Sequence, residues 1–527
     1  MVDFKNVEKN DQDVVKRSHV PRQPWRDIAC QVFGAVATDV GRHFIERWSH
    51  ARRLQGCVVD RKEAGRLFIE RWWSHAKKFL GLQGDDNYDT IPALELQAPD
   101  RKIIIKFDER NNKIGKESIS DCTASVAAVF KELETTNTPP QMSPIIPLTS
   151  CQILRSVSRW SGGTRHESSI HAAYCSLIEN AEQFVYIENQ FFASAVVDGD
   201  HLMGNRIAAA LCSRIVRAIR KKEKFRVVVV MPLFPGFAGE VETESGNSGP
   251  LLTVMHWQYR TICRGENSIL AQIQNAIREY KRDVTPGDFI QFYSLRNWST
   301  MGTTTETAAN ENGKNNHEEE QKNSFQQQEP MIKTENVYVH SKCLNVDDVH
   351  LLVGSANIND RSMLGNRDSE MCMLMEDKTK HFGKTMRSST MMEFFGDYET
   401  NSVSNDLNYK PESQYIDWMN DEVWSKMIAH ANKNTKTYRD ILLPLPDDTI
   451  KTWKELKRLR KNRSFDIKLF SPDQMKASNN IFKDVVRMKN DIKGIIVKFP
   501  LEFLADENLQ PSVYSNTMGS LAPSIFN

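Results

Sequence analysis

The stretch VYVHSKCLNVDDVHLLVGSAN, residues 337–357, decides how the rest of the chain is interpreted. Its first part is rich in β-branched and aromatic residues, which favours a strand, and side chains two apart on a strand point the same way. His340 and Lys342 should therefore share a face. The Asp347-Asp348 pair is typical of a turn, and the apolar run after it predicts an antiparallel strand that brings residues 354–357 back to the same end.

Four kinds of polar group would then converge at that end: the imidazole of His340, the ammonium of Lys342, the hydroxyl of Ser355 and the carboxamide of Asn357. Convergent donors of this kind suit a phosphate. His-x-Lys alone would be interpreted as a surface hairpin. The longer pattern, in which Asp347 follows after four residues and Gly-Ser-x-Asn after six more, is far more specific and favours a phosphate site.

Length, charge and cysteine usage exclude several classes of protein. The chain has 527 residues, enough for one large or two to three ordinary domains, and a formal net charge of +1, which argues against a dedicated nucleic-acid binder. Its nine cysteines are scattered, with no Cys-x-x-Cys pair, and so predict neither a disulfide framework nor a zinc site. We expect a cytoplasmic protein. No apolar run approaches a membrane span, so any membrane contact should be peripheral.

Helical and strand patterns alternate along the chain before the opening stretch. Helices are predicted at 28–48, 167–181, 207–220 and from about 251, and strands at 184–192, 225–232 and 289–295. Continuous β-branched runs between helices predict strands buried on both faces in an α/β sandwich. Residues 303–330 are almost wholly polar, which predicts a disordered insertion.

The N-terminal region contains a local duplication, since residues 42–48 recur as 66–72. It also contains a second His-x-Lys, formed by His75 and Lys77. Leu82 stands where the Asp of the pattern should be, no Gly-Ser-x-Asn follows, and the flanking pattern is helical. We therefore interpret this pair as part of a basic helix face.

The opening stretch resembles the phospholipase D superfamily, and residues 354–359 (GSANIN), 360–362 (DRS) and 366–370 (NRDSE) resemble its animal and plant enzymes more closely still. The resemblance covers about residues 20–55 and 145–527. It implies an α/β fold, a mixed sheet flanked by helices, forming the second half of a pseudo-two-fold bilobal molecule. The domains expected on this basis are an N-terminal helical segment (1–82), a connector (83–147), the catalytic half (148–400) and a C-terminal region packing on it (401–527).

The resemblance implies hydrolysis of phosphatidylcholine-type lipids to phosphatidate and a free alcohol through a phosphohistidine, without metal or other cofactor. His340 would serve as general acid and then base, Lys342 and Asn357 would hold phosphate oxygens, and Ser355 would support the loop. Asp347 would orient the motif by ion pairing or hydrogen bonding. A carboxylate from Asp368 or Glu370 would set the His340 tautomer. The resemblance also places Glu188, Asn189 and Gln190 near the centre, and the alternative is that they only cap a strand.

Phospholipase D enzymes carry two His-x-Lys motifs, and this chain has only the one that resembles the second. Three interpretations follow: an enzyme whose first half lies outside this sequence, a homodimer that pairs two copies of His340, or a half-protein that binds phosphate or lipid without catalysis. The partners expected are a phospholipid membrane surface, contacted peripherally, and, by family resemblance, a small GTPase or phosphoinositide regulator. No nucleic-acid partner is expected.

Overall fold

The computed structural model describes residues 23–54 except 31, 33 and 34, together with 149–197, 203–236, 241, 249–301, 331–397, 413–461, 467–468 and 486–510. The second copy of the duplication, the His75–Lys77 pair, the 83–147 connector and the 303–330 insertion lie outside the described residues. The predictions made for them are therefore not tested.

A single large mixed sheet organises the described chain. Its main path runs β1-β7-β6-β5-β4-β8-β9-β10-β2-β3, with β11 on β7 and β12 on β6. Strands β4, β5 and β6 are parallel to one another, β1 is parallel to β7, and the remaining pairs are antiparallel. The strands are β1 (Trp25–Arg26), β2 (Thr149–Val157), β3 (Glu167–Ser168), β4 (Phe184–Glu188), β5 (Arg226–Val230), β6 (Ile290–Met301), β7 (Met331–Val339), β8 (Cys343–Val346), β9 (His350–Gly354), β10 (Glu370–Asp377), β11 (Ile467–Lys468) and β12 (Ile496–Lys498).

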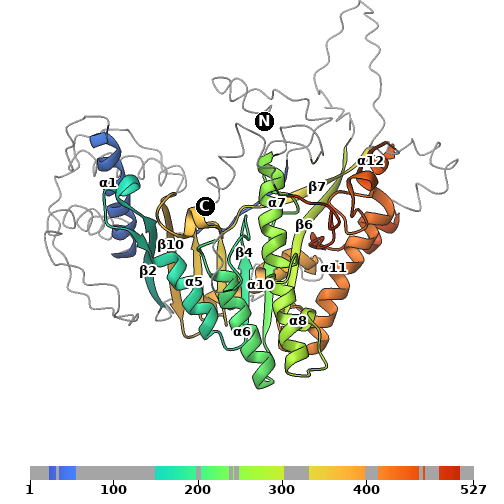
Figure 1. The fold of residues 1–527 in the computed structure, drawn as a ribbon, viewed down its shortest axis with the longest axis horizontal. Coiled ribbons are helices and arrows are strands. Elements are labelled where there is room, and N and C mark those ends of the chain that lie inside the picture. The colour runs from blue at the N-terminus through green and yellow to red at the C-terminus, as the bar shows by residue number, and fades with distance from the viewer. Residues whose placement is uncertain are drawn as a thin grey trace, which may run out of the picture.

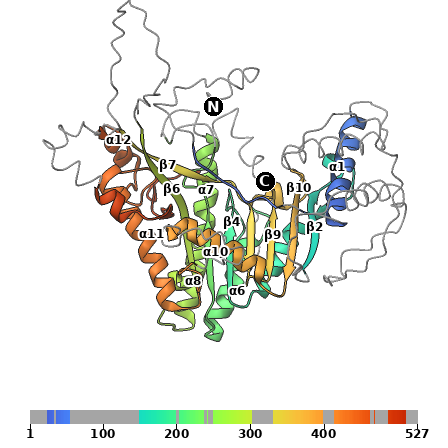
Figure 2. The same cartoon turned by 180° about the vertical axis from the view of Figure 1, so that it is seen from behind.

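Helices cover both faces of the sheet. Helices α5 to α8 lie on the face nearer the viewer in Figure 1, and α10 and α11 lie on the face seen from behind in Figure 2. The helices are α1 (Ala35–Leu54), α4 (Arg159–Gly162), α5 (Ser169–Asn180), α6 (Ile207–Lys221), α7 (Gly249–Ile262), α8 (Ile269–Glu279), α9 (Asp360–Met363), α10 (His381–Phe395), α11 (Asp421–Leu442) and α12 (Trp453–Lys461), with a 3-10 turn at Pro286–Asp288. The predicted mixed α/β architecture is confirmed.

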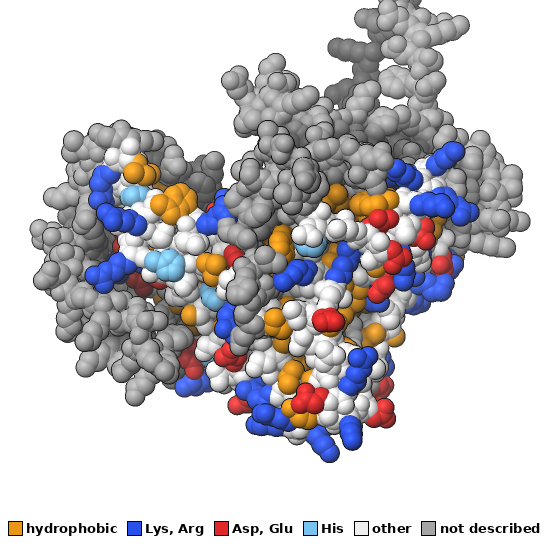
Figure 3. Space-filling model, viewed as in Figure 1, with side chains coloured by type: hydrophobic (Ala, Val, Ile, Leu, Met, Phe, Trp, Pro, Cys, Tyr) orange, Lys and Arg blue, Asp and Glu red, His pale blue; other side chains and the backbone are white. Residues whose placement is uncertain are grey.

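The charged side chains are spread over the surface, and Lys and Arg gather both at the end where α12 lies and at the lower end of the view, with Asp and Glu beside them (Figure 3). No helix among the described residues is long and apolar enough to cross a membrane. The C-terminal elements belong to the same body as the sheet, because β12 pairs with β6 and Asn434 of α11 donates to the carbonyl of Ile496 at 2.9 Å.

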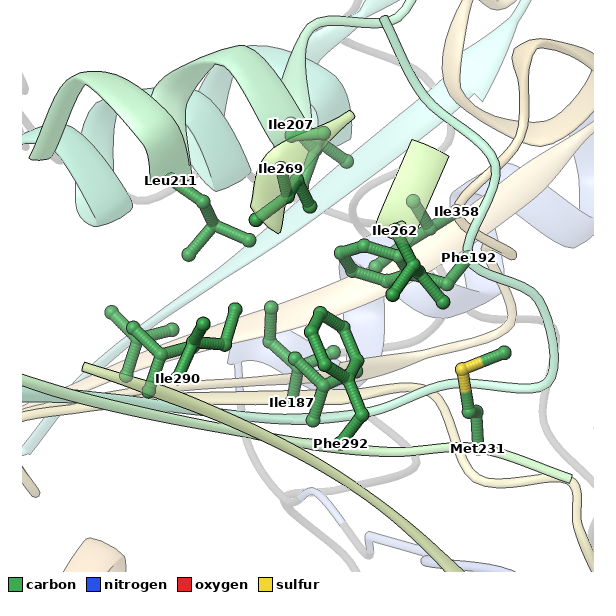
Figure 4. Close-up of a cluster of buried hydrophobic side chains, with 14 of the residues drawn as sticks. Ile187, Phe192, Ile207, Leu211, Met231, Ile262, Ile269, Ile290, Phe292 and Ile358 are labelled. Atoms are coloured by element: carbon green, nitrogen blue, oxygen red, sulfur yellow. The ribbon is translucent and has the colours of Figure 1, made fainter. Parts of the chain in front are cut away.

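The core has two layers because the central strands are buried on both faces. On β4, Val185 and Ile187 pack toward α5, α6 and α8, whereas Phe184 and Tyr186 pack toward α10 and α11. Figure 4 shows Ile187 among the side chains of the first layer, facing residues from the helices above the sheet. Two-sided burial explains why these strands are continuous apolar runs.

Two local predictions were wrong. Helix α1 begins at Ala35 and not at Ile28, and the preceding Trp25 and Arg26 pair with β7 as β1. The opening stretch is not one strand up to the turn: β7 ends at Val339 and β8 begins at Cys343. These two strands pair with different partners, β7 with β6 and β8 with β4, so the chain must leave one pairing before entering the other.

Candidate active site

The candidate site lies where β7 passes the carboxyl ends of the parallel strands. Beyond its pairing with β6, β7 brings Tyr338 to the segments that follow β4 and β5. The Tyr338 hydroxyl accepts hydrogen bonds from Gln190 Nε2 at 2.8 Å and from the Gly236 amide at 3.1 Å. A Cβ at Gly236 would lie 2.3 Å from that hydroxyl, so the approach requires glycine. Ligand sites of open α/β sheets commonly form at this edge.

Residues 24–27, which we call the strap, hold both the backbone amide and the imidazole of His340. The carbonyl of Arg26 accepts from the His340 amide at 2.7 Å, and the Asp27 carboxylate contacts His340 Nδ1 at 2.9 Å. The Trp25 ring lies 4.9 Å from the imidazole, centroid to centroid. Because Asp27 engages Nδ1, the other ring nitrogen, Nε2, is the one that can exchange a proton with a substrate.

Asp27 was not among the residues predicted for the site, and the expectation that Asp368 or Glu370 holds His340 was wrong. Asp368 pairs with Arg361 at 2.5 Å, and the Glu370 carboxylate accepts from Ser355 and Ser362 at 2.5 and 2.7 Å. Burial raises the pKa of Asp27, but hydrogen bonds from His340 and from the Ile28 amide outweigh it, so the net pKa is lowered. The carboxylate is therefore charged at neutral pH.

Lys342 is buried beside His340, with 5% of its surface exposed. Its Nζ donates to Gln190 Oε1 at 3.0 Å and to the carbonyl of His340 at 2.5 Å. Burial lowers its pKa from 10.5 to about 8, against the opposing charges of Asp27 and Glu370. Gln190 therefore contacts both the lysine and Tyr338, and of the predicted residues Glu188, Asn189 and Gln190 it is the one that contacts Lys342.

The loop at residues 354–357 reaches Lys342 through its backbone. The Gly354 amide donates to the carbonyl of Lys342 at 3.1 Å, and a Cβ at Gly354 would lie 2.2 Å from the Cys372 sulfur. Asn189 ties this loop to β4, since its Oδ1 accepts from the Ile358 amide at 3.0 Å. The Asn357 Oδ1 is buried with no hydrogen-bond partner within the described residues. Because this oxygen is a hydrogen-bond acceptor, a ligand that satisfied it would have to present a donor.

Glu188 stabilises the strap through Arg26. Its fully buried carboxylate lies 3.0 Å from the Arg26 guanidinium, and it accepts from the Tyr186 hydroxyl at 2.6 Å and from the hydroxyl of Ser341. Arg26 also pairs with Glu393. Glu188 thus positions the segment that carries His340 through side-chain contacts, and these contacts are not the capping of a strand.

Asp347 lies at the opposite end of β8 from Lys342. Its carboxylate accepts hydrogen bonds from the amides of Glu182, Gln183 and Phe184 at 2.7, 2.8 and 2.8 Å, and its φ of +56° places it in the turn before β9. It orients the motif by hydrogen bonding, as expected, but it fixes β8 against the start of β4 and does not contact His340.

Together these contacts place a histidine held at Nδ1 beside a buried lysine on a mixed α/β sheet, an arrangement that suits a phosphate ester. No group of acidic, histidine or cysteine side chains that could hold a metal ion is present in the described part of the chain.

Comparisons with known proteins agree with this class of site. The family model "Phospholipase D" matches residues 3–78 and 102–393, and the chain belongs to that family. It is 32% identical to "Phospholipase D zeta 1" of Arabidopsis thaliana over 98% of this chain and 51% of that protein, and 31% identical to "Phospholipase D1" of Homo sapiens over 97% and 38%. The chain thus spans about half, or less, of the length of these relatives. A solved phospholipase D family member, Nuc from Salmonella typhimurium, is 14% identical with a TM-score of 0.21, covering 45% of this chain and 89% of that one.

Proposed function

We propose that the protein hydrolyses the phosphodiester bond between phosphatidate and the headgroup alcohol of phosphatidylcholine-type lipids, through a phosphohistidine. The observation that supports this best is the Asp27–His340 contact beside a buried Lys342. The contact fixes the imidazole so that Nε2 can give and take a proton, and the ammonium supplies positive charge for the phosphate. The names of the relatives agree with this activity.

In the proposed reaction, a second histidine attacks phosphorus while His340 protonates the departing alcohol oxygen. His340 then removes a proton from water, whose oxygen attacks phosphorus and releases the second histidine. That nucleophile comes from a second motif, either in sequence beyond this chain or in a second copy of it. The alternative function, a half-protein that only binds phosphate or lipid, predicts binding without turnover.

Headgroup release and transfer of the phosphatidyl group to an added primary alcohol test the proposal. His340→Asn should abolish both, whereas His381→Asn, an exposed histidine on α10, should leave them unchanged. If activity depends on pairing two copies, the specific activity should fall on dilution as the dimer dissociates. Equal turnover by wild type and His340→Asn would exclude catalysis by this chain.

We also propose peripheral binding to anionic membranes through α12. Its apolar side is buried, with Leu456 2% exposed, while basic side chains are exposed on the rest of the helix. These are Lys454, Lys457, Arg458 and Lys461. Each basic residue near an anionic lipid surface contributes about 1 kcal/mol.

Sedimentation with lipid vesicles tests this surface. Replacing Lys454, Lys457 and Arg458 with Gln should weaken binding to vesicles that contain phosphatidylserine or a phosphoinositide by about a hundredfold. The matched control replaces Arg220, Lys221 and Lys222, exposed at the far end of α6, and should bind as wild type does. Equal loss in both variants, or in neither, would contradict a specific role for α12.

A further inference from the structure

The Tyr338 hydroxyl carries a proton that no described residue accepts. Its oxygen accepts hydrogen bonds from Gln190 Nε2 at 2.8 Å and from the Gly236 amide at 3.1 Å. A phenol oxygen has two lone pairs and one O–H, so both lone pairs are engaged and only the proton is left to donate. Because the side chain is 5% exposed, a hydroxyl proton without an acceptor would be costly there, and a group from outside the described chain should receive it.

Lys342 fixes the direction of the Gln190 hydrogen bond. An ammonium group can only donate, and Lys342 Nζ lies 3.0 Å from Gln190 Oε1, so the amide oxygen faces the lysine. The amide nitrogen then faces Tyr338 and donates to it. The contact with Gly236 has the same direction, because a backbone N–H has no lone pair to offer. The hydroxyl must therefore act as a donor toward a third group.

We propose that Tyr338 is a further catalytic residue, whose hydroxyl donates to a non-bridging oxygen of the substrate phosphate. The inference rests on the proposed function, because it adds a donor for the same phosphate. Lys342 uses two of its three N–H bonds within the protein, so one remains for the phosphate. Gln190 contacts both Lys342 and Tyr338, and the His340 ring lies 6.4 Å from the Tyr338 ring, centroid to centroid. The three groups thus border one position.

A phenol suits this position because it donates a hydrogen bond without adding charge. Burial raises the pKa of Tyr338, although the hydrogen bonds from Gln190 and the Gly236 amide act against it, so the hydroxyl keeps its proton at neutral pH. The position is accessible, since Gly236 is exposed and Gln190 is half-buried. A donor already aimed at the phosphoryl oxygens stabilises the charge they carry during transfer without reorganising.

Tyr338→Phe tests the hydroxyl and keeps the ring. In calorimetric titrations of the full chain, the variant should bind inorganic phosphate about tenfold more weakly than wild type. Headgroup release from phosphatidylcholine should fall by about a hundredfold. Tyr259→Phe is the matched control, because Tyr259 is also buried but its hydroxyl donates to the Pro500 carbonyl at 2.9 Å. It should leave both phosphate binding and headgroup release unchanged.

A crystal structure of the wild type with inorganic phosphate distinguishes donation from a purely structural role of the hydroxyl. One phosphate oxygen should lie about 2.7 Å from Tyr338 Oη. A phosphate that contacts Lys342 but not this hydroxyl would overturn the inference. Wild-type affinity and wild-type headgroup release by Tyr338→Phe would also overturn it and leave the proposed function standing. Tyr338-dependent phosphate binding by a wild type that releases no headgroup would overturn the proposed function and leave the phosphate contact standing.

Discussion

Replacing Lys342 with methionine should stabilise the fold at neutral pH while removing the charge that the site uses. The lysine is 5% exposed, and burial lowers its pKa from 10.5 to about 8. That difference in pKa corresponds to a free-energy cost of about 3 kcal/mol for keeping the Lys342 ammonium charged in the folded protein. Methionine fills a similar volume without charge but loses the hydrogen bonds to Gln190 and to the His340 carbonyl, each worth about 1 kcal/mol. The expected net gain at pH 7 is about 1 kcal/mol.

The pH dependence of this gain follows from the two pKa values of Lys342. The amine loses its proton near pH 8 in the folded protein and near pH 10.5 in the unfolded chain. Between these values the unfolded state binds more protons, so wild-type stability rises with pH. The methionine variant lacks this contribution. Its advantage over wild type should therefore fall by about 3 kcal/mol as the pH rises from 8 to 10.5, which makes it the less stable protein at the alkaline end.

Urea unfolding of both proteins at pH 7 and pH 10 measures this difference, and the other titrating groups cancel between them. Lys378→Met is the control, because Lys378 is exposed and its replacement should give the same small effect at both pH values. A stability difference between wild type and Lys342→Met that is equal at pH 7 and pH 10 would refute the reasoning, since it would show that Lys342 carries no buried charge.

Three further predictions concern Lys342, Asp27 and Asp347. Glycerophosphocholine, whose charge is constant above neutral pH, should bind about tenfold more weakly at pH 9 than at pH 7, because Lys342 loses its proton near pH 8; a flat titration profile would contradict this. Asp27→Asn should lower turnover by about tenfold to a hundredfold at unchanged melting temperature, because it weakens the hold on His340 Nδ1, and a purely structural role would instead lower the melting temperature. Asp347→Ala should cost about 3 kcal/mol in urea unfolding, because three amides lose their acceptor, yet leave phosphate binding by the folded protein unchanged.

The sequence predicted those elements whose patterns are local. The apolar runs around residues 184–192 and 225–232 became β4 and β5, and the predicted helices at 167–181 and 207–220 became α5 and α6 with ends within about two residues. A strand buried on both faces has a continuous apolar run, and a helix buried on one face has apolar residues at the helical period. Both patterns can be recognised without knowing the distant partners of the element.

The geometry around His340 could not be predicted because it depends on distant pairing. Residues 337–346 have the composition of a strand, yet the strand ends at Val339, because the chain beyond it pairs with β4 and not with β6. Asp27 lies 313 residues from His340 in sequence, and no local pattern encodes that contact. Asp347 belongs to the same motif as Lys342, yet the strand β8 stands between them, and four strand residues span about 13 Å.

Three successive residues of the strap position His340, because two of them contact its imidazole and the one between them anchors the segment. Side chains alternate along residues 25–27, so Trp25 and Asp27 both contact the imidazole, while Arg26 between them pairs with Glu188 and Glu393. The buried ion pair therefore fixes the register in which the indole and the carboxylate meet His340. A shift by one residue would bring the guanidinium to the imidazole and bury a carboxylate beside Glu188, at a cost of several kcal/mol. The geometry of His340 thus depends as much on residues 24–27 as on the motif that contains it.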